Sequence, residues 1–89
     1  MFTRDEFRES VIKGIKKITH ASEVNISDDD SFADYGLDSL EGMNLVLKVE
    51  ADLGIDLGEF DIEDANTINL FFEKAKATLE EKTKNSGNT

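Results

Sequence analysis

The sequence predicts an all-α fold, a four-helix bundle with three principal helices and one short helix. Apolar residues recur at helical spacing in three separate stretches, and no stretch alternates apolar and polar residues long enough to form a sheet. Each of these stretches also begins at a residue type that caps helices. A chain of 89 residues forms one small domain with a modest core.

The first helix is expected to begin at the stretch "TRDEF". Thr3 and Glu6 have the three-residue spacing of a capping box, in which each residue satisfies a backbone N–H group of the other. The core-facing residues that follow at helical spacing are Phe7, Val11, Ile15 and Ile18. A polar loop from Ser22 to Gly36 comes next, and its three apolar anchors to the core are expected to be Val24, Ile26 and Phe32.

Three consecutive aspartates at positions 28–30 of this loop suggest a calcium site, but the spacing is wrong. An EF-hand loop needs oxygen ligands at alternate positions and a glycine at the sixth. Phe32 stands in the third ligand's place and Ala33 in the place of the glycine. We therefore expect no metal site. His20 is expected to end the first helix rather than bind metal, because the sequence has no second histidine and no cysteine.

The second helix is predicted from Asp38, as N-cap, to about Leu53, with Gly54 ending it. Glu41 has the spacing to complete a capping box with Asp38. The apolar residues of this helix fall on two sides. An inner stripe, expected to face the core, consists of Leu45, Val46, Val49 and Leu53. An outer stripe, roughly opposite, consists of Leu40, Met43, Leu47 and Ala51.

A short helix is predicted over Asp61 to Ala65, and the last helix is predicted to begin after a Thr67 cap. The buried face of this last helix is expected to consist of Ile68, Phe71, Phe72, Ala75 and Leu79. The end of the chain, "KTKNSGNT", has no apolar residue. We expect a folded domain over residues 1–82 and a disordered tail over residues 83–89.

The charge balance limits the classes of partner. Ten basic residues against twenty acidic ones give a net charge of −10, which repels nucleic acid and anionic lipid and favours basic protein surfaces. The first residues carry charges where a signal peptide needs an apolar run, and no apolar stretch is long enough to span a bilayer. We expect a monomeric cytoplasmic protein that binds neither nucleic acid nor membrane.

Ser39, in "GLDSL", has three possible roles, of which the simplest is to cap the helix that follows. Asp38 fills that role better, which leaves the Ser39 hydroxyl exposed in the first turn, beside unpaired N–H groups that favour a phosphate. A hydrolase nucleophile needs a base and an oxyanion hole. His20 is the sole histidine, and "GLDSL" lacks both the second glycine and the preceding strand of a nucleophile elbow.

The stretch "DYGLDSLEGMNLVLKVEADLGIDL" resembles the phosphopantetheine attachment segment of the acyl and peptidyl carrier proteins. The resemblance extends from the helix near Thr3 to "NTINLF", over nearly the whole domain. It implies a four-helix bundle without catalytic activity, in which a phosphopantetheinyl transferase attaches 4′-phosphopantetheine from coenzyme A to Ser39. The thiol of this arm then holds acyl or aminoacyl cargo as a thioester.

The same resemblance implies three kinds of partner: the transferase, a cargo-loading ligase or acyltransferase, and downstream synthase or tailoring enzymes. Their expected docking surface consists of Asp38, Leu40, Glu41, Met43 and Leu47, because clustered exposed apolar residues mark interaction sites. Lys48 and Ala51 stand where fatty-acid carriers are typically acidic. A specialised polyketide-type or nonribosomal-peptide-type pathway is therefore favoured over fatty-acid synthesis. The competing hypotheses are an unmodified acidic adaptor that binds a basic protein through the second helix and, more weakly, a serine hydrolase.

Overall fold

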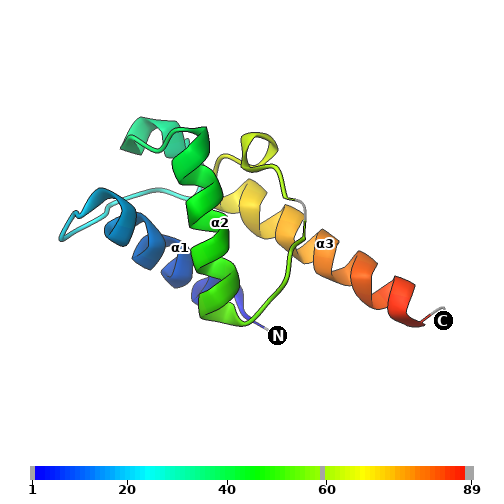
Figure 1. Ribbon diagram of the computed structural model, residues 1–89. Helices are drawn as coiled ribbons and strands as arrows, with labels where there is room; N and C mark the ends of the chain where they lie inside the picture. Colours follow the sequence, from blue (N-terminus) through cyan, green and yellow to red (C-terminus); the bar gives the residue numbers. More distant parts are fainter. Residues whose placement is uncertain (1, 59, 88–89) are drawn as a thin grey trace.

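The computed structural model describes residues 2–58 and 60–87, and beyond residue 81 only the backbone. Figure 1 shows α2 passing in front of α1, α3 extending away on the other side of α2, and long connections between the helices. The elements in chain order are α1 (Arg4–Thr19), the 3-10 helix η1 (Phe32–Tyr35), α2 (Ser39–Leu53), the 3-10 helix η2 (Ile62–Asp64) and α3 (Ile68–Gly87). The described residues contain no strand, so the all-α prediction with three principal helices is confirmed, and the predicted short helix is the single 3-10 turn η2.

The capping box predicted at the start of α1 is present. The Thr3 hydroxyl accepts a hydrogen bond from the Glu6 N–H at 3.2 Å, and the Glu6 carboxylate accepts one from the Thr3 N–H at 2.9 Å. The helix ends at His20, whose backbone adopts the left-handed conformation with φ of 61°. His20 therefore closes α1, as its position in the sequence predicts.

The predicted limits of α2 are also confirmed. Asp38 accepts a hydrogen bond from the Glu41 N–H at 2.9 Å, which is one half of the predicted capping box; the hydrogen bonds of the described residues do not include the return half. At the other end Gly54 adopts φ of 66° and donates its N–H to the Glu50 carbonyl. A glycine avoids the steric cost of this conformation.

The last helix runs further than predicted. It starts after Thr67, whose hydroxyl accepts a hydrogen bond from the Leu70 N–H at 3.1 Å, and it continues to Gly87. α3 is helical to Gly87, and "KTKNS" contains no proline or glycine that would stop it earlier. The disorder expected over residues 83–89 stays a prediction. Residues 88–89 lie outside the described residues, and the domain limit at residue 82 stays a prediction.

The core is built around phenylalanine rings contributed by three elements and a loop. The rings of Phe7 and Phe71 lie edge to face, with centroids 4.8 Å apart, and the Phe60 ring lies 5.2 Å from that of Phe71. Such pairs stabilise the fold beyond the area they bury. On the last helix Ile68, Phe71 and Ala75 are buried as predicted, while Phe72 and Leu79 are partly exposed at its edge. Every helix within the described ranges is too short or too polar to cross a bilayer.

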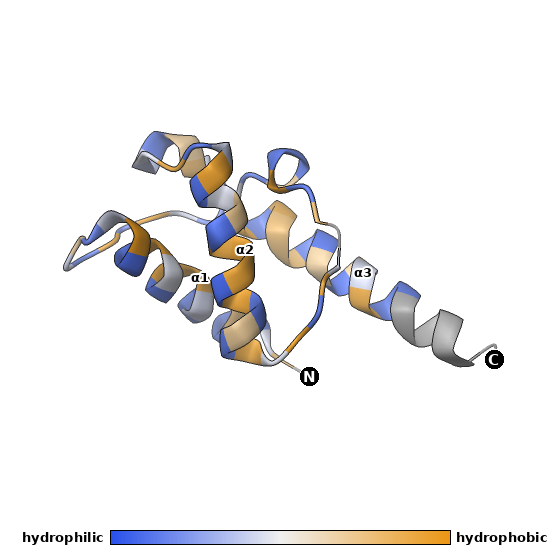
Figure 2. Cartoon of the chain, in the orientation of Figure 1, coloured by the Kyte–Doolittle hydropathy of each residue, from blue (hydrophilic) through white to orange (hydrophobic). Residues whose placement is uncertain are grey.

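The two apolar stripes of α2 have different environments. On the inner stripe Leu45, Val46 and Val49 are buried, and Leu53 is half-buried at the end of the helix. α1 approaches this stripe at Gly14, where a methyl group would lie only 2.6 Å from the Leu45 side chain. The outer stripe is exposed along its whole length. Figure 2 shows hydrophobic and hydrophilic bands alternating along α2, as expected of a helix with apolar residues on both sides.

Candidate functional site

Ser39 is the first residue of α2 and is exposed. Among the described residues, none forms a hydrogen bond with its hydroxyl. Asp38 is the N-cap, and its carboxylate accepts a hydrogen bond from the Glu41 N–H. The Gly42 N–H donates to the Asp38 carbonyl at 2.8 Å. The N–H groups of Ser39 and Leu40 therefore remain available at the positive end of the helix dipole, an environment that favours a phosphate group.

The chain just before Ser39 is held in place by η1 and by Leu37. Gly36 ends η1 with φ of 82° and donates its N–H to the Ala33 carbonyl at 3.1 Å. Leu37 is buried, and its N–H bonds to the Phe32 carbonyl at 3.3 Å. Phe32 is itself buried in the core. Ser39 thus lies two residues after a fixed anchor rather than on a mobile loop tip.

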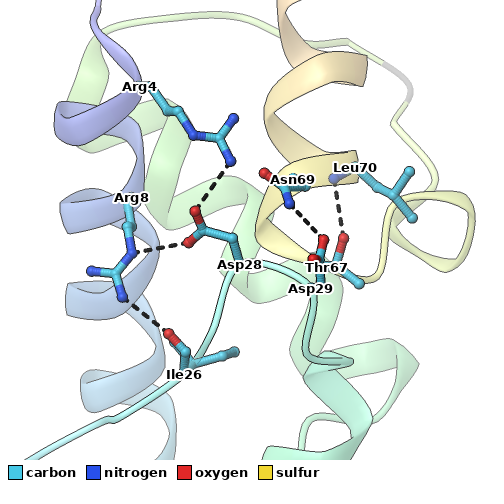
Figure 3. Close-up of polar contacts among 8 residues, drawn as sticks. All are labelled: Arg4, Arg8, Ile26, Asp28, Asp29, Thr67, Asn69 and Leu70. Atoms are coloured by element: carbon cyan, nitrogen blue, oxygen red, sulfur yellow. Dashed lines mark hydrogen bonds and ion pairs between the residues drawn. The ribbon is translucent and has the colours of Figure 1, made fainter.

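Charged contacts attach the preceding loop to α1 (Figure 3). Asp28 accepts hydrogen bonds from Arg4 at 3.1 Å and Arg8 at 3.0 Å, and Arg8 also donates to the Ile26 carbonyl at 3.0 Å. Partial burial opposes ionisation of Asp28, but hydrogen bonds and charge from the two arginines outweigh it and hold the pKa of this carboxyl below its ordinary value.

The same loop is attached to α3 by its neighbouring residues. The Asn69 side chain donates to Asp29 at 2.6 Å, and the Asn69 N–H bonds to the Asp28 carbonyl at 3.0 Å. Asp30 accepts hydrogen bonds from the Ser27 N–H at 3.0 Å and from the Tyr35 hydroxyl at 2.8 Å. Within the described residues no cluster of His, Asp or Glu side chains is arranged as a metal site. The three aspartates fasten the loop to the helices and to itself, a role that sequence spacing did not reveal.

A groove about 640 Å³ in volume runs beside Ser39, between α2 and the segment that contains η2. Its residues come from successive turns of α2 and from η2 and its flanks, and they include Ser39, Met43, Val46, Leu47, Phe60 and Ile62. Most of these side chains are apolar. Carboxylates of Glu50, Asp61 and Glu63 also line it. We call this feature the α2–η2 groove.

η2 can lie this close to α2 because residue 42 is a glycine. A methyl group at Gly42 would lie 2.7 Å from Cγ2 of Ile62, closer than carbon atoms pack. Ile62 is buried against the turn of α2 that contains Gly42. Asp61 caps η2 by accepting a hydrogen bond from the Glu63 N–H at 3.0 Å. The role of Gly42 was not predicted from the sequence, although a glycine inside a predicted helix is a signal of close packing.

The three apolar residues of the predicted docking surface lie along one side of α2. Leu40 is 72% exposed, Met43 59% and Leu47 61%, so none of them is needed to complete the core. Asp38 is exposed and Glu41 half-buried at the same end of the helix. The structure therefore places Leu40, Met43 and Leu47 on one surface next to Ser39, with Asp38 at the start of the helix and Glu41 on another side of it. The docking function of all five residues stays a prediction.

Comparison with known protein families identifies the class of this site. The family model for the phosphopantetheine attachment site matches residues 9–72, which is well over half of the chain. The chain belongs to this family. The resemblance to acyl and peptidyl carrier proteins is thereby confirmed. No curated protein and no solved structure matches the chain significantly.

Members of the phosphopantetheine attachment family carry a covalent 4′-phosphopantetheine group, and the residues around Ser39 fit such a group. The hydroxyl is exposed, and the start of α2 offers N–H donors for a phosphodiester. The α2–η2 groove begins at the same serine and offers apolar side chains to the chain of the arm. The arm, when bound, supplies a terminal thiol that can hold cargo as a thioester.

The position of His20 does not support the hydrolase hypothesis. A nucleophilic serine needs a base within hydrogen-bonding distance. In the described part of the chain, His20 forms no hydrogen bond with Ser39 and stands as the C-cap of α1. Its environment is that of a residue that ends a helix.

Proposed function

We propose that this protein is a non-catalytic carrier that bears 4′-phosphopantetheine on Ser39 and presents acyl or aminoacyl thioesters to partner enzymes. The observation that carries the proposal is the position of Ser39, exposed at the start of α2 within the segment that the family model matches. The anchor at Leu37 and the cap at Asp38 hold this serine at a defined position on the surface.

The modification follows from the chemistry of the serine hydroxyl. The Ser39 oxygen attacks the β-phosphorus of coenzyme A, the bond between this phosphorus and the bridging oxygen breaks, and adenosine 3′,5′-bisphosphate leaves. The hydroxyl proton passes to a base of the transferase, because no described residue accepts a hydrogen bond from the Ser39 hydroxyl. The start of α2 then stabilises the negative charge of the phosphodiester.

The outer stripe of α2 is the proposed docking surface for the transferase, the cargo-loading enzyme and the downstream synthase or tailoring enzymes. Leu40, Met43 and Leu47 present apolar contacts beside the attachment point, and Asp38 and Glu41 present negative charge to basic partners. A specialised pathway of polyketide or nonribosomal-peptide type is favoured over fatty-acid synthesis, because Lys48 and Ala51 stand on this helix where fatty-acid carriers are typically acidic.

The decisive experiment incubates the purified protein with coenzyme A and a promiscuous phosphopantetheinyl transferase and measures its mass. We expect the wild type to gain one phosphopantetheine group and Ser39→Ala to gain none. Ser22→Ala is the matched control, since Ser22 is an exposed serine elsewhere in the matched segment and should leave the gain unchanged. A wild type that gains no mass, or a Ser39→Ala variant that gains as much, would refute the proposal.

The acidic adaptor remains the second candidate because the outer stripe is exposed and lies beside acidic residues. An adaptor would bind a basic protein through α2 without modification. The same mass measurement separates the two functions, because only a carrier acquires an arm.

A further inference from the structure

A second hollow lies between α1 and α2, on the far side of α2 from the α2–η2 groove. At 100° per residue, Lys48 and Asp52 point roughly opposite to Met43 and Val46. The hollow has a volume of about 400 Å³ and is lined by Ser10, Lys13, Lys17, Lys48, Ala51 and Asp52. We call it the lysine notch.

The notch concentrates positive charge on a protein whose net charge is −10. Lys13 pairs with Asp52 at 3.4 Å, but Lys17 and Lys48 form no ion pair with any described residue. Elsewhere, Arg4 and Arg8 are paired with Asp28. Three ammonium groups around one carboxylate leave the notch with an excess of positive charge.

A buried hydroxyl lines the same hollow. Ser10 is only 2% exposed, and its oxygen has no hydrogen-bond partner of good geometry in the described part of the chain. It lies close enough to Asp52 to be the largest influence that lowers the pKa of this carboxyl, ahead of the charge of Lys13. A buried hydroxyl that acts on Asp52 only at poor geometry is an incompletely satisfied donor. The notch thus combines the ammonium groups of Lys17 and Lys48, which are in no ion pair with the described residues, with a buried hydroxyl donor.

The lysine notch is continuous with the outer stripe of α2, because Ala51 belongs to both. A protein docked on Leu40, Met43 and Leu47 would extend over this rim. Along the helix, the surface changes from acidic at Asp38 and Glu41 to basic at the notch.

We propose that the lysine notch receives a carboxylate side chain from the partner protein that docks on the outer stripe. This inference rests on the proposed docking function of that stripe. Lys17 and Lys48 bind the carboxylate by charge, and the Ser10 hydroxyl donates a hydrogen bond to it. A partner with basic groups at one end and an acidic group at the other fits α2 in one direction only, so the notch sets the orientation in which the partner faces Ser39.

The test is a titration of the full-length, isotope-labelled protein with tetraglutamate and, separately, tetralysine at low salt, followed by NMR. Tetraglutamate should shift the amide signals of residues 10–17 and 48–52, and tetralysine those of residues 38–41 and 61–64. The double variant Lys17→Glu/Lys48→Glu should weaken the tetraglutamate affinity at least tenfold. The control is the double variant Lys74→Glu/Lys76→Glu, which makes the same change of charge on α3. Tetraglutamate should still shift the amide signals of the notch residues in this variant.

Ser10→Ala tests the hydroxyl separately and should weaken tetraglutamate binding about threefold while the thermal melt stays cooperative. Tetraglutamate shifts that are absent, or that spread equally over the lysines of α3, would overturn the proposal. So would binding that survives Lys17→Glu/Lys48→Glu undiminished. These outcomes are distinct from a failure of the carrier function, which the mass gain on Ser39 reports independently.

Discussion

The inner and outer stripes of α2 are similarly hydrophobic, yet only the inner one contributes to the core. Leu45 and Val49 are completely buried, whereas Leu40 and Leu47 keep more than half of their surface exposed. The difference lies in what packs opposite: α1 approaches the inner stripe at Gly14, and no element covers the outer stripe within the described residues. Hydrophobicity beyond what the core needs is therefore available for binding partners.

The largest expected effect is the loss of an inner-stripe side chain. Leu45→Ala should lower the free energy of unfolding by about 3 kcal/mol and Val49→Ala by about 2 kcal/mol, because each leaves a cavity in addition to losing transfer energy. Chemical denaturation measures both changes. The rate of arm attachment per folded molecule should stay normal. An inner-stripe variant that keeps its stability but acquires the arm slowly would contradict the assignment of this stripe to the core alone.

The next effect concerns the close contact between α2 and η2. Gly42→Ala should destabilise the protein by about 1 kcal/mol, because overpacking against Ile62 exceeds the gain in helix propensity. A double-mutant cycle with Ile62→Ala checks the cause, since removal of the isoleucine should make Gly42→Ala neutral or stabilising. Additive effects would show that the glycine is not required by this contact.

On the outer stripe the expected pattern is reversed. Met43→Ala and Leu47→Ala should each change the free energy of unfolding by less than about 0.5 kcal/mol, because their side chains are mostly exposed. The initial rate of arm attachment should nevertheless fall several-fold, since central apolar contacts carry most of an interface's energy. Leu70→Ala, at an exposed leucine on α3, is the control and should alter neither quantity. If Met43→Ala or Leu47→Ala unfolds the protein, the outer stripe belongs to the core.

A smaller effect is expected from charge at the beginning of the outer stripe. Glu41→Lys should slow arm attachment at low salt and much less at high salt, because exposed charge steers encounter and salt screens it. Glu80→Lys makes the same change of charge on α3 and should have little effect. Equal rates for the two variants at low ionic strength would argue against steering by Glu41.

The smallest expected effect is a change in the pKa of Asp52, on the side of α2 that lines the lysine notch. The Ser10 hydroxyl and the charges of Lys13 and Lys17 hold the pKa of Asp52 below its ordinary value. Asp52 therefore contributes stability above about pH 4, and this contribution is lost as the pH falls through its lowered pKa. Ser10→Ala should raise the pKa of Asp52 toward the ordinary value, which a carboxyl NMR titration would measure. An unchanged pKa would mean that the hydroxyl does not act on Asp52.

Much of the site could be predicted because its determinants are local. Asp38, Ser39 and Gly54 mark the start and end of α2 through backbone capping, which depends on residues only a few positions apart. The fastening of the loop by Asp28 could not be predicted, since its partners Arg4 and Arg8 lie 24 and 20 residues away. The sequence predicted only a polar loop there.

By itself, the sequence determined the helical periodicity, the caps, the two stripes of α2 and the exposed position of Ser39. These follow from the chemistry of each residue and its near neighbours. Only the tertiary structure decided that α1 covers the inner stripe at Gly14, that Gly42 admits Ile62 to form the α2–η2 groove, and that lysines of α1 and α2 meet around Ser10. These features depend on which helix faces lie against each other, and that is settled by packing between residues far apart in the chain.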